Sequence, residues 1–214
     1  MEYIPLIFST IAIIISISTF YLTRLKIGNI KMTRPSIIFF GPDGVGEKHK
    51  KIFIRTLLYS SSEKGNYIEN MYIKLLRENK TQIFNVWVYG DNDLVRGSGL
   101  YISKKGIANN HHFLMPKDGS DYNFIAGNYV LQVYVEIVNK RPRKIYEQRL
   151  TITENQGEEL NKSNAGIYFD WTPNTQNYLS HIDKRGNENE SFKDYLELMT
   201  KEKQNEIKTA ANKA

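Results

Sequence analysis

The sequence contains no cysteine, and this absence excludes several kinds of chemistry at once. Without thiols the chain forms no disulfide bond, no thiolate nucleophile and no cysteine-based zinc site. The lack of cysteine fits a reducing compartment, although domains outside the cytoplasm also lack it in many cases. Histidine is scarce as well, with four residues in a chain of 214.

A complete phosphate-binding loop is also missing. The glycine-rich segment 41–46 resembles the start of one, but Gly46 is followed by Glu47, Lys48 and His49. The motif requires lysine directly after the last glycine and then a serine or threonine that ligates Mg²⁺. The residues that follow alternate like a strand, whereas the motif opens a helix. Segment 41–46 is therefore interpreted as a turn.

The adjacent pair His111 and His112 is the nearest approach to a metal site in the sequence. Neighbouring residues on a strand face opposite sides, so the two rings do not share an ion. Only His49 and His181 remain, and zinc needs three or four ligands. We expect no metal, no cofactor and no catalytic residues, because no spacing of nucleophile, base and acid is present.

The positive charge is concentrated near the N-terminus. Between Arg24 and Ser60 eight lysine and arginine residues stand against Asp43 and Glu47, and the other charges of the chain cancel. A nucleic-acid-binding protein would carry such an excess over a broad face of its domain. The excess here lies beside an apolar segment, so no nucleic-acid partner is expected.

That apolar segment, residues 3–23, carries no charge and is rich in isoleucine, leucine and phenylalanine. About 20 residues of helix cross the ~30 Å hydrocarbon core of a bilayer. A cleaved signal peptide would need a basic start and a small-x-small cleavage site, and the chain begins Met1-Glu2. Residues 1–23 are therefore predicted to be an uncleaved transmembrane anchor whose partner is membrane lipid.

Residues 24–34 form a basic juxtamembrane linker with Arg24, Lys26, Lys31 and Arg34. We expect these four side chains to contact the anionic membrane surface. Positively charged flanks remain on the cytoplasmic side of a membrane. The prediction is a single-pass protein of a bacterial cell (inner) membrane with its soluble domain in the cytoplasm.

The clearest strand signal lies in residues 124–138, where apolar and polar positions alternate from Tyr129 onward. A period of two with many β-branched and aromatic residues indicates a strand with one apolar face. A basic turn, residues 140–144, leads to a second strand, residues 145–153. This turn has two open interpretations: a solvated hairpin tip, or a contact for phosphate or anionic lipid headgroups.

Six further strands precede this hairpin, and turn signals separate them at intervals typical of a sandwich or barrel. In the fourth of them Phe84, Val86 and Val88 are expected on one face and Trp87 on the other. No long amphipathic helix interrupts the strands, which argues against a parallel sheet. The six segments are residues 36–40, 52–59, 67–77, 83–89, 98–103 and 107–115.

Residues 35–154 have the length of an immunoglobulin-type domain. The segment Ala126-Gly-Asn-Tyr129 before an alternating strand resembles the tyrosine corner of such folds, in which a tyrosine hydroxyl bonds to upstream backbone. Trp87 would then be the core tryptophan. The fold class is predicted as all-β, an immunoglobulin-like antiparallel β-sandwich of about 7–9 strands. The resemblance is to an architecture and implies no functional family.

The composition changes after residue 154. Residues 155–190 comprise a polar linker and an aromatic island, where Tyr168, Phe169, Trp171 and Tyr178 are the candidate partner-binding residues. Pro173 and the polar residues after it argue against a regular strand, so the island is expected to be irregular and either to pack on the domain or to bind a partner. Residues 191–214 are predicted as a short amphipathic helix that becomes disordered.

These features favour a membrane-tethered, non-catalytic interaction or assembly module. We expect it to bind a protein partner through the sandwich and the aromatic island. The alternative is a β-sandwich that binds a small ligand or glycan on exposed aromatic side chains. The architecture alone does not decide between them, since sandwiches serve both functions.

The predicted orientation is testable with a single introduced cysteine, because the chain has none of its own. In intact cells Ser120→Cys should resist a membrane-impermeant maleimide, and it should react after lysis. The protein should also remain in the membrane pellet after an alkaline carbonate wash. Labelling of intact cells would place the domain on the outer side.

Overall fold

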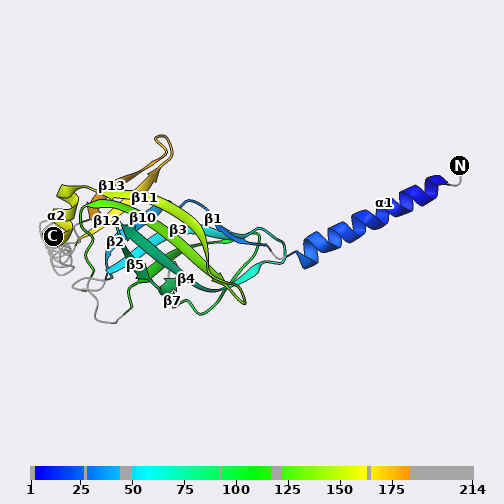
Figure 1. Ribbon diagram of the computed structural model, residues 1–214, viewed down its shortest axis with the longest axis horizontal. Helices are drawn as coiled ribbons and strands as arrows, with labels where there is room; N and C mark the ends of the chain where they lie inside the picture. The colour runs from blue at the N-terminus through cyan, green and yellow to red at the C-terminus, as the bar shows by residue number, and fades with distance from the viewer. Residues whose placement is uncertain are drawn as a thin grey trace, which may run out of the picture.

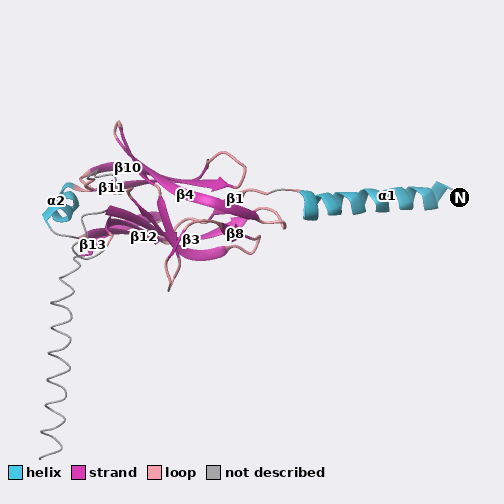
Figure 2. Cartoon of the chain, turned by 90° about the horizontal axis from the view of Figure 1, so that it is seen from below, coloured by secondary structure: helices cyan, strands magenta, loops and turns pink. Residues whose placement is uncertain are grey.

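The fold is taken from a computed structural model of the chain, and the structure describes residues 3–26, 28–43, 50–91, 93–116, 122–162 and 165–183. These residues are mostly β structure in two antiparallel sheets, and a long helix precedes them. Figure 1 shows this helix projecting from one end of the sheets, while the short helix α2 lies at the other end. Figure 2 shows the two sheets as facing layers.

The N-terminal helix is apolar and fully exposed. Helix α1 (Tyr3–Phe20) continues into a π-helical turn, η1 (Tyr21–Leu25), and together they form a helix of 23 residues in which Arg24 is the one charged side chain. Ser9 and Thr10 both donate hydrogen bonds to the Leu6 carbonyl, at 2.9 and 2.8 Å. Their hydroxyls are thus satisfied within the helix. The helix is long and apolar enough to cross a membrane.

The first sheet has the order β13, β12, β2, β3, β9, β6, β7, and β1 also pairs with β3. All of its pairings are antiparallel. Its strands are β1 (Ile30–Met32), β2 (Ile37–Pro42), β3 (Lys50–Ser60), β6 (Val86–Tyr89), β7 (Val95–Arg96), β9 (Ile107–Leu114), β12 (Gly166–Thr172) and β13 (Asn177–Asp183).

The second sheet has the order β11, β10, β4, β5, and β8 also pairs with β4. Side chains from both sheets form one core, to which the buried rings of Phe40, Phe84, Trp87 and Phe113 contribute. The strands of this sheet are β4 (Asn66–Arg77), β5 (Lys80–Phe84), β8 (Leu100–Ile102), β10 (Gly127–Ile137) and β11 (Arg143–Ile152).

Strand β10 is the centre of the second sheet, as its alternating sequence predicts. It pairs with β11 on one side and with β4 on the other. Every second side chain points into the core and is buried, which confirms the predicted apolar face. The buried positions are Tyr129, Leu131, Val133, Val135 and Ile137.

The predicted single strand over residues 83–89 is wrong, because the chain changes sheets at Asn85. Strand β5 pairs with β4 in the second sheet, whereas β6 pairs with β9 in the first. The break resets the alternation, so Phe84 and Trp87 both point into the core and are 0% and 2% exposed. Trp87 is a core tryptophan, as expected, but Phe84 does not lie on the face opposite to it.

The prediction of an irregular aromatic island is also wrong. Residues 166–172 form β12, which pairs with β2, and residues 177–183 form β13, which pairs with β12. Pro173 begins the four-residue turn between the two strands, where it breaks no ladder hydrogen bond. The island therefore extends the first sheet by a hairpin.

Helix α2 (Glu154–Lys162) occupies most of the predicted polar linker and connects the two sheets. Thr153 and Gln156 cap its start reciprocally: the Gln156 amide donates to Thr153 Oγ1, and the Thr153 amide donates to Gln156 Oε1. Gln156 also donates to Ser180 Oγ of β13 at 2.9 Å. The helix predicted within residues 191–214 lies outside the described residues.

The hydroxyl of Tyr129 bonds to upstream backbone, as the sequence predicts. It donates to the Ile125 carbonyl at 2.7 Å and accepts from the Ile125 amide at 3.0 Å, and the residue is 1% exposed. The ring also packs edge-on against Phe40 of the first sheet, with centroids 6.0 Å apart. One side chain thus fixes the start of β10 and contacts the opposite layer.

Removing this hydroxyl should destabilise the protein while leaving the ring in place. Tyr129→Phe leaves two backbone groups of Ile125 without their partner, at a cost of about 1–3 kcal/mol. For a domain of this size each kcal/mol lowers the melting temperature by about 2–4 °C. Tyr67→Phe, at a residue that is 62% exposed, is the matched control. Equal melting temperatures for the two variants would contradict this role.

Candidate functional site

The four predicted partner-binding residues do not share one surface. They lie on β12 and β13, where alternate side chains face opposite sides of the sheet. Tyr168 points outward, whereas Phe169, Trp171 and Tyr178 point toward the interior side. Phe169 is 2% exposed and belongs to the core. The structure therefore places Tyr168 on the outer face of the sheet, Phe169 in the core, and Trp171 and Tyr178 at a packed edge.

Trp171 and Tyr178 close the side of the sandwich where β13 approaches β11. Their rings meet edge-on, with centroids 5.2 Å apart, and the Arg34 guanidinium lies 3.8 Å from the Trp171 ring centroid. Tyr178 donates to the Pro35 carbonyl at 2.6 Å, and its hydroxyl is 3.5 Å from that of Tyr146 on β11. Burial raises the pKa of Tyr178, so its hydroxyl remains a donor. These contacts hold the domain together.

The residues predicted to contact an anionic surface are likewise divided. Arg24 lies in the last turn of the long helix, and Lys26 follows directly; both are exposed. Lys31 is exposed on β1, opposite Tyr59. Arg34 instead lies over Trp171 and belongs to the packed edge.

The outward face of the first sheet carries a row of five rings, here named the outer aromatic row. Each ring lies directly opposite the next on a neighbouring strand. Cross-strand neighbours at such positions are close enough for their rings to interact. The members, in order across β13, β12, β2, β3 and β9, are His181, Tyr168, Phe39, Phe53 and His112.

The rings of this row contact one another across the sheet. Tyr168 stacks on His181, with centroids 5.4 Å apart and an interplanar angle of 12°, and it also contacts Phe39 at 4.7 Å. Phe53 lies 5.0 Å from His112. Phe39 leans over Gly41 and Gly166, where a Cβ would come within 2.4 and 2.0 Å of its ring. Two glycines thus make room for the central ring.

Above this row the surface is hollowed. The hollow has a volume of about 350 Å³, and Phe39, Phe53, Tyr168 and His112 line it. The segment between β6 and β7 forms one wall, with Leu94 exposed at its rim. Ligand sites are typically concave, mostly apolar and supplied with a few polar groups. Here the polar groups are Lys51, Asp91 and Asn110.

The charges around the hollow are paired. Lys51 lies 3.3 Å from an Asp43 carboxylate oxygen and also donates to the Asp43 carbonyl at 3.0 Å. Arg55 lies 3.5 Å from Asp91 and donates to Asn110 Oδ1 at 3.0 Å. Two cations thus stand against two carboxylates. The hollow consequently offers apolar and hydrogen-bonding contacts without a strong net charge.

His112 is the histidine that lines the hollow, and it is uncharged near neutral pH. Its burial, and then the positive charge of Lys51, lower its pKa to about 4. A base with so low a pKa is a poor proton acceptor at pH 7. Its imidazole is suited to stacking and hydrogen bonding, so the arrangement favours binding over proton transfer.

His111 lies on the other side of the same strand, which confirms that the two histidines face opposite ways. It accepts a hydrogen bond from Trp87 Nε1 at 3.2 Å and is 1% exposed. Its Nε2 has no hydrogen-bond partner in the part of the chain that the structure describes. Burial, and then the neighbouring His112, lower its pKa to about 4. Over those same residues, no cluster of three or more His, Asp or Glu is placed to hold a metal ion.

Phe39, Phe53 and His112 were not predicted from the sequence as members of a common surface. A weak signal was available, since each of them occupies the outward position of a predicted strand. The solvent-facing side of an antiparallel sheet is usually polar, so aromatic side chains at several outward positions indicate a common surface. The grouping, however, depends on knowing which strands are neighbours, and β12 pairs with β2 across most of the chain.

Comparison of the sequence with known protein families and with curated proteins finds no match. The function of the chain is therefore inferred from its own geometry.

The low pKa values of the two histidines predict that stability falls on acidification. Their pKa values are lower in the folded state than the usual 6.5, so the unfolded chain binds more protons between pH 6.5 and 4. The free energy of unfolding should rise with pH across this window. His111→Gln keeps an acceptor for Trp87 but cannot titrate, so it should remove about 1 kcal/mol per pH unit of slope between pH 5 and 6. An unchanged slope in denaturant titrations would contradict the assignment.

Proposed function

We propose that this chain is a membrane-anchored, non-catalytic interaction module. In this proposal α1 and η1 span the cell membrane once, and an immunoglobulin-like sandwich binds a protein partner through the outer aromatic row. The observation that carries the proposal is the hollow of about 350 Å³ above four rings of the outer aromatic row, which are aligned across β12, β2, β3 and β9. Aromatic side chains grouped around a pocket are typical anchors of protein interfaces.

The membrane anchor is supported by the exposure of the long helix. Between Tyr3 and Leu25 apolar side chains surround the helix, and none of them is buried against the sandwich. A helix that is apolar all round is stable only in a core or in lipid. Arg24 lies in its last turn, and Lys26 and Lys31 follow it, which supports a cytoplasmic position for the sandwich.

The immunoglobulin-like identity is supported by three features. Two antiparallel sheets face each other, Trp87 is buried between them, and Tyr129 bonds to backbone four residues upstream. We place the domain at residues 30–183, wider than the 35–154 that the sequence indicates. The reason is that β1 pairs with β3, while β12 extends the first sheet.

The partner is proposed to be a protein because the row is long and its charges cancel. Lys51 and Arg55 are matched by Asp43 and Asp91, so the surface does not select a charged ligand. A row across five strands matches an extended apolar patch on another protein better than a single small molecule. Paired charges around an apolar centre also form the polar rim that interfaces commonly have.

A glycan or other small ligand is the second candidate. It is favoured by the concavity of the hollow and by the amide of Asn110 beside the rings. A volume of this size lies at the lower end of the range for small-molecule sites. The outcome of the experiment below separates this candidate from a protein partner.

A photo-reactive amino acid at the rim tests the proposal in native membranes. Leu94, which is 57% exposed beside the hollow, is replaced by benzoylphenylalanine, and Ile83, 41% exposed on the other sheet, is the control site. We expect a protein adduct from position 94 only. Adding Phe53→Ala should lower the adduct yield about tenfold or more, because hot-spot residues contribute roughly 2 kcal/mol.

Each outcome of this photo-crosslinking experiment supports or contradicts one of the two candidates. Adducts of equal yield at positions 94 and 83, or adducts that survive Phe53→Ala in a variant with native melting behaviour, would contradict the proposed surface. No protein adduct, together with a glycan that protects position 94 from labelling, would favour the second candidate.

A further inference from the structure

The connection between the long helix and the sandwich is fixed by hydrogen bonds. The Gly28 amide donates to Ser62 Oγ at 2.9 Å, and the Asn29 amide donates to Ser61 Oγ at 2.8 Å. The Ser61 amide donates in return to the Asn29 carbonyl at 2.9 Å. Gly28 is packed so closely that a Cβ there would lie 2.5 Å from the Ser62 nitrogen. The chain leaving the helix is thus held by the loop that follows β3.

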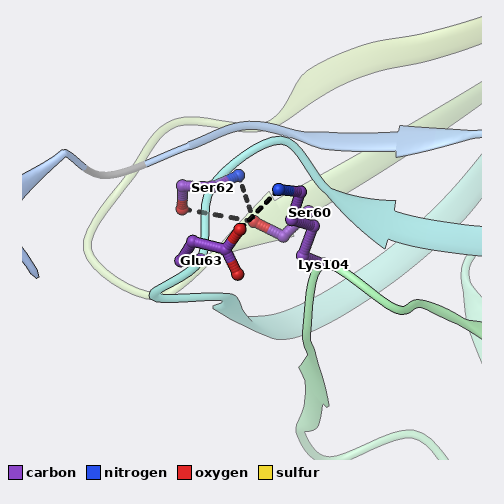
Figure 3. Close-up of polar contacts among 4 residues, drawn as sticks. All are labelled: Ser60, Ser62, Glu63 and Lys104. Carbon is purple, nitrogen blue, oxygen red and sulfur yellow. Dashed lines mark hydrogen bonds and ion pairs between the residues drawn. The ribbon is translucent and has the colours of Figure 1, made fainter. Parts of the chain in front are cut away.

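This loop is itself well ordered by buried polar contacts. Ser60 Oγ accepts from Asn66 Nδ2 at 2.9 Å and from the Ser62 amide at 3.3 Å, and Ser60 is 1% exposed. Figure 3 shows these serines beside the ion pair that Lys104 forms with Glu63 of the same loop. The serine cluster therefore joins the helix connection to the end of β3 and to Asn66 at the start of β4.

The connection is also short. Helical structure ends at Leu25, and Gly28 is already hydrogen-bonded to the sandwich. Three residues span at most about 10 Å even when fully extended. If α1 and η1 cross a bilayer, this end of the sandwich lies within that distance of the helix end.

Three loops form this end: residues 61–65 after β3, 103–106 after β8, and 138–142 after β10. The Ser60 amide donates to the Ser103 carbonyl at 3.0 Å, and the Val138 amide donates to the Tyr67 carbonyl at 3.2 Å. Arg143 donates to the Ile30 carbonyl at 2.9 Å, which joins the third loop to β1. Figures 1 and 2 show these loops on the side of the sheets from which α1 extends.

The three loops are strongly basic. Together with Arg143 at their margin they carry six cations and one carboxylate, Glu63, which is paired with Lys104. All six cations are exposed, and within the described residues Lys64, Lys105, Lys140 and Arg141 form no ion pair. The six are Lys64, Lys104, Lys105, Lys140, Arg141 and Arg143.

We infer that this end of the sandwich is a docking surface for anionic phospholipid headgroups. This inference rests on the proposed membrane anchoring and adds a second contact to it: the loops lie flat on the membrane and fix the orientation of the domain. Phosphate-bearing headgroups complement the cations, and the span of the connection, at most about 10 Å, is comparable to the Debye length of roughly 8 Å at physiological salt. The basic turn at residues 140–144, open to two interpretations from its sequence, belongs to this surface.

The short connection to the helix favours a membrane surface over a soluble anion as the ligand of these loops. A loosely attached domain would need high affinity to stay on lipid, whereas a connection of three residues holds the loops at high effective concentration. The orientation that results leaves the outer aromatic row on the side of the sandwich, where a partner can reach it. Arg24 and Lys26, which precede the connection, extend the same basic surface.

The full chain in lipid nanodiscs tests this inference. An environment-sensitive fluorophore is attached to Val138→Cys in the third loop or to Asn79→Cys in the turn between β4 and β5, and the discs contain phosphatidylcholine alone or with phosphatidylglycerol. We expect a blue shift at position 138 only in the anionic discs, lost at high salt, and no shift at position 79.

Charge removal provides the matched control. The variant Lys105→Gln/Lys140→Gln/Arg141→Gln should lose the shift at position 138, whereas Lys80→Gln/Arg96→Gln/Arg149→Gln, with the same change in net charge, should keep it. A shift of equal size in neutral discs, or one retained after the first triple substitution, would overturn the inference. The same shift produced in neutral discs by inorganic phosphate would overturn the lipid as its source. Failure of the chain to enter discs of either composition would instead overturn the anchoring on which the inference rests.

Discussion

The apolar face of β10 packs into the core between the sheets, and both layers take their positions from this burial. Five alternate side chains of the strand are buried, from Tyr129 to Ile137. A slip of one residue in the pairing with β4 or β11 would turn all of them to solvent. At about 25 cal/mol per Å² of buried apolar surface, such a slip would remove most of the stability of the domain. Register in the second sheet is therefore set by burial, and Tyr129 fixes where the strand begins.

The local part of this fold could be predicted from the sequence, because alternation is a property of neighbouring residues. The strands around β3, β4, β9 and β10 and the opposite faces of His111 and His112 follow from spacing alone. The backbone contact of Tyr129 follows from the resemblance of residues 126–129 to a tyrosine corner. The helix Tyr3–Leu25 follows from composition.

The errors arise where a distant part of the chain overrides the local pattern. At Asn85 the alternation restarts, because the strand continues in the other sheet. Pro173 correctly indicated a turn, but the turn joins two strands of a hairpin and does not mark an irregular segment. Residues 166–172 become a strand because β2 offers them an edge to pair with. No feature of the sequence near residues 166–183 indicates that the edge of β2 is available for pairing.

The candidate site follows from the same long-range pairings. Four residues of the aromatic island were predicted to bind a partner, and of these only Tyr168 lies on the outer face. The other three, Phe169, Trp171 and Tyr178, face inward or close an edge of the sandwich. The rings that do accompany Tyr168 come from β2, β3, β9 and β13. A binding surface on a sheet is a row across strands, perpendicular to the chain, and a sequence read along the chain displays only one point of it at a time.

The pairing of β2 with β12 also has a consequence for biosynthesis. Residues 37–40 emerge from the ribosome early, and residues 167–170, which cover their edge, emerge near the end of the described chain. At roughly 5–20 residues per second, the interval is on the order of ten seconds. Throughout it, one side of β2 presents unpaired backbone groups next to Ile38, Phe39 and Phe40, a combination that invites pairing with other chains. If the N-terminal helix inserts into a membrane as proposed, it does so before β2 is complete, so each nascent chain is held at the membrane during this interval and meets fewer neighbours.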